Sequence, residues 1–554
     1  MELKPTKTWS RRARGCPALL GAAFLGAWVL TGCGADAGAG GLSKSAGDSA
    51  ADAGAAGPGG EWGGAADDAG MAPEDETERL AFSPPAVGTD HVWVVSPDND
   101  LLLRIDARTR AVDPIPVGDA PSKVVTVPGK ERGVVLNRGS DELSLVDVGA
   151  DGVSDVTFVA LPRHFNALTL DPSGTHAVLW FDLETAVSGE DATALQDAAV
   201  VDLTNFAAPK LHALATGFRP RAPFFSTDGK TCFLVTEDGL TVVDLNAVGE
   251  NSGAVPRLLP TATDAFHQDG REVAIAPDGT YVVSRGAGET GITILTPADE
   301  QLRYIELGAE PTDLDLFADG SRALVMLRDA KQAAFVNLSD GQVDRVPLTA
   351  PLGSAVVSPQ GDKALLYTTL PMANLEPRIA ILDLRTNPPT MTERPVRKEI
   401  AGAVIAPGGG AAFLLHRKSD GEPDPTLPPD ELLARSHGFS LVDLASGFVR
   451  LVTTPAEPTG VLFSADLARA WVPLGDANRD VRALMVADLS GLSVRNVELP
   501  SVPEVVGEVP AADRIFVTQT HPEGRISFLA RDAAGAENDA LETLSGYLLN
   551  GRIE

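Results

Sequence analysis

The sequence predicts an all-β protein, a β-propeller built from four-stranded antiparallel blades. The main evidence for this fold is a turn signal that recurs about every 40 to 60 residues, each time at the end of a short apolar strand. An Asp, Asn or Thr side chain at this position can accept backbone N–H bonds from residues further along and so close a tight turn. The signal falls at Asp106, Asp147, Asp202, Asp244, Thr296, Asn337, Asp383, Asp443, Asp488 and near Asp532.

A second turn signal, rich in Pro, Asp and Gly, alternates with the first. It occurs at 171–174, 227–229, 277–279, 318–320, 359–361 and 407–409. Four short strands separated by such turns, in a repeat of roughly 40 to 50 residues, are typical of a propeller blade. Counting the anchors gives ten units. One ten-bladed ring, two smaller propellers, or a seven- to eight-bladed ring with extra strands fit this count, and the absence of a composition break favours one ring.

Residues 101–138 contain the clearest unit, LLLRIDARTRAVDPIPVGDAPSKVVTVPGKERGVVLNR. This unit resembles the YVTN-type repeats of bacterial propellers, a group that includes lactonase-like propellers. The family's usual turn and strand are only partly kept, as Pro128-Gly-Lys and VVLNR. The resemblance implies the propeller fold for most of residues 88–550. It supplies no catalytic residues that can be transferred to this chain.

The first unit begins at HVWVVSP, residues 91–97, and has no evident first strand. The end of the chain offers a spare strand, Tyr547–Ile553. We expect this segment to complete the first blade, because closing a ring with strands from both ends removes exposed sheet edges.

The N-terminus has the layout of a bacterial lipoprotein leader. Residues 1–15 are basic, and residues 17–30 form an apolar run too short for a comfortable membrane span. The sequence Leu30-Thr-Gly-Cys33 then resembles a lipobox. We therefore expect residues 1–32 to be a signal peptide and Cys33 to carry the lipid. The protein would be anchored in the bacterial cell envelope, and Gly34 favours the outer membrane.

Residues 33–80 are dominated by Gly, Ala, Ser and Asp, with few large apolar groups to bury. This composition predicts a disordered acidic tether, which leaves residues 81–554 as the propeller. The formal net charge of −31 makes nucleic acid an unfavourable partner. After removal of the leader and lipidation of Cys33, Cys232 would be the one free thiol, and we expect it to be a buried strand residue.

Motifs for catalysis are absent from the sequence. The eight histidines have no short metal-ligand spacing, and neither GxSxG nor GxxxxGK occurs. Two acidic segments, Asp98–Asp100 and Asp476–Asp480, carry oxygen ligands suited to Ca²⁺. Neither is followed by the Gly and Glu of a calcium loop, so we interpret both as turns. We therefore predict no catalytic residue, no bound metal and no cofactor.

Insertions between strands point to a binding face. They occupy 183–196, 261–270, 369–378 and 417–437. In a propeller, loops joining second and third strands share a face with the loops joining successive blades, so the insertions of units 3, 7 and 8 should gather there. Repeat proteins often bind partners through such insertions, although surface loops also lengthen at little energetic cost.

Charged residues end several second strands and would surround this face. They are Arg138, Asp182, Glu237, Arg285, Arg328, Arg417 and Asp476. They could receive an acidic or carbohydrate ligand, or they could form ion pairs between blades. We expect a non-catalytic, membrane-anchored module that binds or scaffolds a protein, peptide or glycan. The alternative is a lactonase-like hydrolase.

Overall fold

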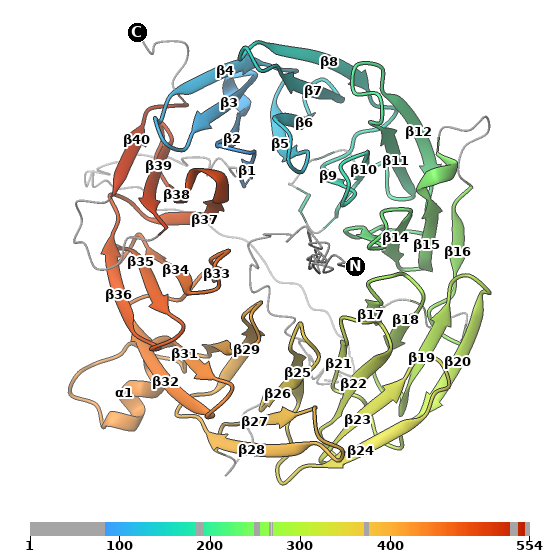
Figure 1. The fold of residues 1–554 in the computed structure, drawn as a ribbon, viewed down its shortest axis with the longest axis vertical. Coiled ribbons are helices and arrows are strands. Elements are labelled where there is room, and N and C mark those ends of the chain that lie inside the picture. The colour runs from blue at the N-terminus through green and yellow to red at the C-terminus, as the bar shows by residue number, and fades with distance from the viewer. Residues whose placement is uncertain are drawn as a thin grey trace, which may run out of the picture.

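The computed structural model describes residues 84–548, except for 184, 187–189, 191, 249–254, 265–267, 269, 370–375 and 532–540. Within this part of the chain, ten four-stranded sheets surround a common centre (Figure 1). All strand pairs are antiparallel, and each sheet is made of four strands that are consecutive in the sequence. The predicted β-propeller is confirmed, and the ten units form one ring.

Each blade runs from the centre of the ring outward (Figure 1). The innermost strands are β1 (Ala86–Val87), β5 (Pro121–Thr126), β9 (Ala167–Leu170), β13 (Phe224–Phe225), β17 (Glu272–Ile275), β21 (Asp313–Leu316), β25 (Ser354–Val357), β29 (Ile400–Ile405), β33 (Leu462–Phe463) and β37 (Pro503–Val509). The second strands are β2 (His91–Ser96), β6 (Arg132–Asn137), β10 (His176–Trp180), β14 (Thr231–Thr236), β18 (Val282–Arg285), β22 (Arg322–Leu327), β26 (Lys363–Tyr367), β30 (Ala411–His416), β34 (Arg469–Asp476) and β38 (Arg514–Gln519).

The outer half of each blade completes the sheet. The third strands are β3 (Leu101–Asp106), β7 (Glu142–Val148), β11 (Asp197–Asp202), β15 (Gly239–Asp244), β19 (Gly291–Thr296), β23 (Gln332–Asn337), β27 (Arg378–Asp383), β31 (His437–Asp443), β35 (Val481–Asp488) and β39 (Arg525–Ala530). The outermost strands are β4 (Val112–Pro116), β8 (Ser154–Ala160), β12 (Lys210–Ala215), β16 (Arg257–Leu259), β20 (Gln301–Glu306), β24 (Val343–Pro347), β28 (Thr390–Pro395), β32 (Phe448–Thr454), β36 (Val494–Glu498) and β40 (Glu542–Ser545).

Helices are few. The one α-helix among the described residues is α1 (Pro429–Arg435), and short 3₁₀ turns occur at Pro97–Asn99, Leu245–Ala247 and Pro510–Ala512. No helix in this part of the chain is long and apolar enough to cross a membrane.

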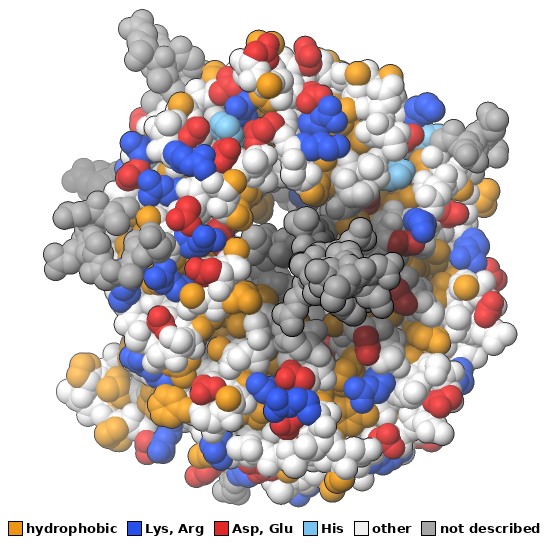
Figure 2. Space-filling view, in the orientation of Figure 1, with side chains coloured by type: hydrophobic (Ala, Val, Ile, Leu, Met, Phe, Trp, Pro, Cys, Tyr) orange, Lys and Arg blue, Asp and Glu red, His pale blue; other side chains and the backbone are white. Residues whose placement is uncertain are grey.

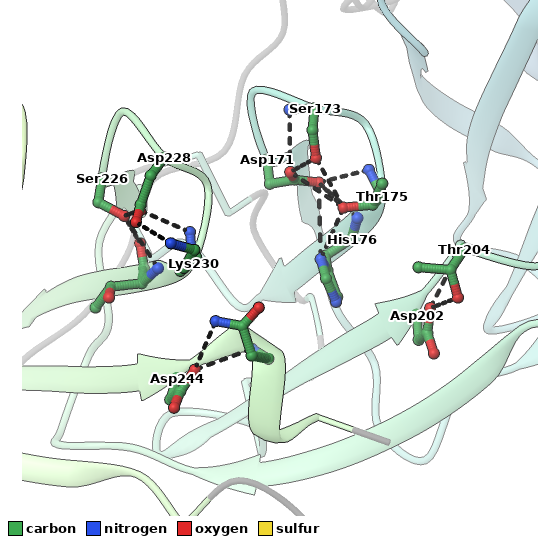
Figure 3. A network of polar contacts seen from close by, with 12 residues as sticks. Asp171, Ser173, Thr175, His176, Asp202, Thr204, Ser226, Asp228, Lys230 and Asp244 are labelled. Atoms are coloured by element: carbon green, nitrogen blue, oxygen red, sulfur yellow. Dashed lines mark hydrogen bonds and ion pairs between the residues drawn. The ribbon is translucent and has the colours of Figure 1, made fainter. Parts of the chain in front are cut away.

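Nine of the ten predicted turn anchors lie at or next to the ends of third strands, as expected, and the anchor near Asp532 falls on residues outside the described part of the chain. Asp106 Oδ1 accepts backbone N–H bonds from Arg108 and Thr109, at 2.8 and 2.7 Å. The alternating second signal closes the turn between first and second strands, where Asp171 accepts the N–H groups of Ser173 and Thr175 (Figure 3). Side-chain acceptors therefore satisfy the backbone groups that each strand leaves unpaired at its end.

The core is divided among the junctions between blades. Ten separate clusters of buried apolar side chains lie one at each junction, including the junction between the last blade and the first. Between blades 6 and 7, for example, Phe317, Met326 and Leu366 are almost fully buried together. Each blade alternates side chains to its two faces, so it contributes to two clusters at once.

Blade 1 has its own first strand, β1, which pairs with β2 at Ala86–Trp93 and Val87–Val92. The prediction that Tyr547–Ile553 completes this blade is therefore wrong. A strand of two residues is too short to show an alternating pattern, so no sequence signal indicates it. Tyr547 and Leu548 instead form a turn after β40, and residues 549–553 lie outside the described part of the chain.

Side-chain packing closes the ring. Val94 and Ile105 of blade 1 pack against Phe516, Phe528 and Tyr547 of blade 10, and all five are at most 5% exposed. No strand is shared across this junction.

Polar contacts border the closing cluster. Asn99 Nδ2 donates to the carbonyl of Leu548 at 2.8 Å, and Arg108 donates to the carbonyl of Ala511. Arg110 forms an ion pair with Glu542. The closing junction therefore resembles the other nine in construction.

We predict that Phe528→Ala destabilises the protein by about 3–5 kcal/mol, the usual cost of removing a fully buried Phe. Phe528 is fully buried in the closing cluster. The thermal unfolding midpoint of the purified protein measures the effect. Phe158→Ala is the matched control, because Phe158 is 53% exposed on β8 and should change stability by less than about 0.5 kcal/mol. Equal midpoints for the two variants would refute closure by packing.

Candidate functional site

The ring has two different faces. Because neighbouring strands are antiparallel, connections between second and third strands emerge on the same side as connections between successive blades. We call this side the insertion face, and it includes residues 181–196 and 417–436. The other side, which includes the turns at 106–111 and 171–175, is called the turn face.

Four long connections emerge on the insertion face. They span 181–196, 260–271, 368–377 and 417–436. The prediction that the insertions of blades 3, 7 and 8 share a face is confirmed, and the loop between blades 4 and 5 joins them. Parts of the first three lie outside the described residues. The turn face also has two long connections, 245–256 and 531–541, which the structure describes only in part.

The loop between blades 4 and 5 is held by one amide side chain. Gln268 Oε1 accepts the backbone N–H groups of Thr261 and Ala262, at 2.6 and 3.1 Å. Gln268 Nε2 donates to the carbonyls of Ala262 and Asp264, at 3.1 and 2.8 Å. Gln268 is only 9% exposed. The described part of this loop is therefore a fixed structure, since its backbone bonds are made internally.

The blade 8 insertion carries α1 and is fixed at the end of that helix. Lys398, 4% exposed in the connection from blade 7, donates from Nζ to the carbonyls of Leu433 and Ala434, at 2.7 and 3.0 Å. Burial lowers the pKa of Lys398. A cation at the C-terminal end of a helix satisfies carbonyl groups that the helix leaves free. Glu422 also pairs with Arg479 of blade 9.

All seven charged residues predicted to surround the insertion face lie at or directly after the ends of second strands. Their partners are local, so the structure does not gather them into one site. Arg138 pairs with Glu190 in the insertion of blade 3. Arg285 pairs with Glu272 of its own blade and donates to the carbonyl of Pro311 in the connection to blade 6, the latter at 2.8 Å.

The other members are similarly dispersed. Arg328 pairs with its neighbour Asp329, Glu237 pairs with Arg219, and the side chain of Asp476 accepts the N–H groups of Asn478 and Arg479. Arg417 is exposed, and the backbone N–H and carbonyl of Asp182 both bond to the amide of Asn166. Their role as ligand contacts stays a prediction.

A histidine connects three loops of the insertion face. His164 Nδ1 lies 2.7 Å from Asp141 Oδ1, and His164 Nε2 lies 3.2 Å from Glu190 Oε1. Glu190, whose side chain is 3% exposed, is also paired with Arg138. Both ring nitrogens face carboxylates, an arrangement that is fully hydrogen-bonded when both carry a proton. The cluster joins the insertion of blade 3 to blade 2, a contact that sequence spacing could not indicate.

A pair of aspartates on β21 was also missed from the sequence. Asp313 Oδ2 and Asp315 Oδ2 accept the N–H groups of Ala355 and Val357 on β25, each at 2.7 Å. The two carboxylates therefore satisfy backbone donors of the next blade. The available signal was the alternation Asp-Leu-Asp-Leu, which places both carboxylates on the same side of the strand.

Burial dominates the electrostatics of this aspartate pair. Burial and, to a smaller extent, the neighbouring Asp313 together raise the pKa of Asp315 to about 6, against the opposing hydrogen bond from Val357. Burial also raises the pKa of Asp313 and of Glu272 on β17, although Arg285 opposes the rise at Glu272. These groups hold their protons more readily than ordinary surface carboxylates.

Other candidates from the sequence have structural partners. Asn99 takes part in ring closure, and Asp100 Oδ1 accepts the N–H group of Ala120, which agrees with the turn interpretation of 98–100. His416 is buried between Ser440 Oγ and the carbonyl of Glu399, and burial lowers its pKa to about 4. Cys232 is a buried free thiol, as predicted, and burial raises its pKa. No group of three metal-ligating side chains occurs among the residues that the structure describes.

Comparisons with known proteins find only distant similarity. No protein-family model and no curated protein matches this chain. A solved structure described as a eukaryotic initiation factor is 11% identical over 74% of this chain and 96% of its own, with a TM-score of 0.44. Dihydro-heme d1 dehydrogenase NirN is 14% identical over 70% of this chain and 84% of its own, with a TM-score of 0.39. AztD from Citrobacter koseri is 18% identical over 55% of this chain and 83% of its own, with a TM-score of 0.32. The chain is a ten-bladed β-propeller on the evidence of its own sheets.

We predict that Asp315→Asn changes how stability depends on pH. Well below pH 4 Asp315 is protonated in both the folded protein and the unfolded chain, so its ionisation adds no cost to folding. Between pH 4 and 6 the folded protein binds a proton that the unfolded chain releases, and above pH 6 the full cost remains. Asp315 should therefore lower the stability of the natural protein by on the order of 3 kcal/mol as pH rises through this range. The variant should lack this part of the fall and keep the parts that come from Asp313 and Glu272.

Thermal unfolding between pH 4 and pH 8 measures the difference. Asp319→Asn is the control, because hydrogen bonds from Ser321 lower the pKa of Asp319, so its contribution changes only below about pH 4 and its curve should run parallel to that of the natural protein between pH 4 and pH 8. Parallel curves for Asp315→Asn and the natural protein would contradict the assignment.

Proposed function

We propose that the protein is a lipid-anchored propeller of the bacterial cell envelope that binds or scaffolds a protein, peptide or glycan through its insertion face. The observation that carries this proposal is that four long connections emerge on one side of the ring. Two of them are braced by buried side chains, Gln268 and Lys398. Loops on a rigid scaffold are the usual place for recognition.

The buried side chains that hold these loops support a role in recognition over neutral lengthening of surface loops. A loop that has only lengthened neutrally needs no buried charge to hold it. Lys398 is 4% exposed and is used to end a helix within an insertion. Burying a cation costs free energy unless it is well bonded, so a shaped insertion is consistent with a surface kept in one conformation for a partner.

Lipid attachment supplies the location in this proposal. Leu30-Thr-Gly-Cys33 resembles a lipobox, and residues 34–80 have the composition of a tether that would hold the ring away from the membrane. The YVTN-type resemblance of residues 101–138 belongs to the same proposal.

We predict that Cys33→Ser abolishes lipid attachment. The chain produced in a bacterium with a clickable fatty acid should carry the label, and the variant should not, because the lipid is joined through the thiol. Cys16→Ser is the matched control and should keep the label, since Cys16 belongs to the leader. Label on the Cys33→Ser protein would disprove anchoring at this residue.

We predict that replacing 419–434 with a short Gly-Ser link removes partner binding and leaves the ring folded, with a lower thermal midpoint because Lys398 loses its acceptors, the carbonyls of Leu433 and Ala434. Ser419 N donates to the carbonyl of Ala434 at 2.9 Å, so the two ends of the insertion already lie together. Binding of the full chain to glycan and peptide arrays measures recognition, and the thermal midpoint measures folding. Lys230→Ala on the turn face is the control, because this exposed side chain pairs only with Asp228 among the described residues. Unchanged recognition by the shortened chain would exclude the insertion of blade 8.

The second candidate is a lactonase-like hydrolase, favoured by the resemblance of residues 101–138 alone. A screen of small lactones with the purified chain separates the two proposals. Turnover that survives in the shortened chain would favour the hydrolase.

A further inference from the structure

Several second strands begin with a cation that lies beside the turn anchor of their own blade. In four blades this position is a lysine or an arginine, and it pairs with the anchor across the sheet. These pairs are Arg132 with Asp147, Arg322 with Asn337, Lys363 with Asp383, and Arg469 with Asp488. Because the four cations share one register, their surroundings can be compared directly.

The three arginines at this register have partners within the ring. Arg132 donates to Asp147 at 2.6 Å. The guanidinium of Arg322 lies 4.2 Å from the centre of the Phe317 ring, and Arg469 donates to a backbone carbonyl of blade 10. Carboxylates, carbonyls and aromatic faces are the usual partners of a guanidinium in a folded protein. The fold therefore provides for the charge in these three blades.

Lys363 has no equivalent partner. The anchor opposite it, Asp383, is taken by Arg385, whose Nε and Nη2 donate to the two carboxylate oxygens at 2.9 and 2.6 Å. These bonds lower the pKa of Asp383 to about 2, so the carboxylate is ionised and paired at neutral pH. Among the residues that the structure describes, Lys363 Nζ has one polar contact, with the carbonyl of Gly409 at 3.5 Å, which is long for a hydrogen bond.

A cavity of ≈ 290 Å³ lies beside this lysine, at the junction between blades 7 and 8. It is on the turn face, between β28 and the turn that follows β31 (Figure 1). Thr390 and Thr392 line it, and because they are two positions apart on β28 their side chains lie on the same side of the strand. The other uncharged lining residues are Ile381, Leu444, Ala445 and Gly447. The volume is at the lower end of the range for small-molecule sites.

The charged groups that line the cavity leave a surplus of one positive charge. They are Lys363, Arg385 and Asp383, two cations against one carboxylate. Arg385 uses Nε and Nη2 for its bonds to Asp383, so its Nη1 hydrogens are available to a ligand. The cavity therefore presents an ammonium group and part of a guanidinium to whatever enters it.

Three further charged groups lie close by, and all are engaged elsewhere. Arg394 donates to two backbone carbonyls, at 2.9 and 3.2 Å. Asp443 accepts two hydrogen bonds of 2.8 Å within its own turn, and Asp362 accepts the hydroxyl of Ser358 at 2.9 Å. None of the three lines the cavity, so the unpaired charge at this junction is that of Lys363.

We propose that the cavity between blades 7 and 8 binds a small hydroxylated carboxylic acid of the sugar-acid type. The ligand's carboxylate pairs with Lys363 and accepts hydrogen bonds from Arg385 Nη1, which neutralises the surplus charge. The hydroxyls of Thr390 and Thr392 can each donate and accept, and so suit hydroxyl groups of the ligand.

The charge balance favours a carboxylate over a phosphate. A dianion would exceed the single surplus charge and would also meet the carboxylate of Asp383, which lines the same cavity. The site lies on the opposite face from the insertions and does not rest on the function proposed above.

Calorimetric titration of the purified full chain with sodium D-glucuronate, at constant ionic strength, tests the site. D-glucose has the same ring without the charge, and inorganic phosphate has charge without the ring. Glucuronate should bind at least about tenfold more tightly than either, the usual effect of a hydrogen bond to a charged group.

Lys363→Gln should weaken glucuronate binding by about tenfold or more, because it removes the surplus charge and keeps a side chain of similar shape. Lys230→Gln is the matched control and should leave binding unchanged, since it makes the same charge change on the turn face of blade 4, where Lys230 pairs with Asp228. Thr392→Val keeps the shape of the side chain, removes its hydroxyl, and should weaken binding about threefold.

Three results would overturn the proposal. They are equal binding of the three probes, no binding of glucuronate at millimolar concentration, and equal affinity of the two lysine variants for glucuronate.

Discussion

The packing of apolar side chains between neighbouring blades is the constraint on which the rest of the structure depends. Each sheet has a hydrophobic cluster on both faces, and the ten clusters form an unbroken circle. At the closing junction Phe528 and Tyr547 of blade 10 meet Val94 and Ile105 of blade 1 without a shared strand. Burial of apolar surface is favourable in proportion to its area, so ring closure needs only that the last junction resemble the others.

The number of blades and the position of their turns could be predicted from the sequence because both depend on local chemistry. Asp106 and Asp488 bond to backbone N–H groups two or three residues away, and such contacts leave a pattern at fixed spacing. The strand at Ala86–Val87 was missed because two residues show no alternation. Assigning the end of the chain to blade 1 followed from that omission.

The candidate site was harder to predict because its contacts join loops that are far apart in the sequence. The seven charged strand ends could be placed on one face from topology, but their partners depend on how the surrounding loops fold. Arg138 meets Glu190 only because the insertion of blade 3 folds back toward blade 2. His164 joins the same cluster from a third loop, and no sequence spacing records this meeting. Space-filling shows acidic, basic and apolar side chains mixed over the turn face, without one dominant patch (Figure 2).

Departures from the repeat are where this ring can acquire specificity. A perfectly regular blade satisfies its own turns and fills its own junctions, as Asp171 and Asp244 do within blades 3 and 4 (Figure 3). Blade 8 differs through the insertion that contains α1, and a cavity of ≈ 290 Å³ lies between blades 7 and 8. Two adjacent blades therefore hold both the most elaborate loop and an unfilled junction.

Circular permutation tests the equivalence of the ten junctions most directly. One permutant joins residues 548 and 84 by a flexible linker and opens the chain between Gly118 and Asp119, between two blades. A second uses the same linker and opens between Gly139 and Ser140, within a blade. We expect the first permutant to keep a thermal unfolding midpoint within a few degrees of the natural chain and the second to be clearly less stable. A first permutant as unstable as the second would contradict closure by side-chain packing.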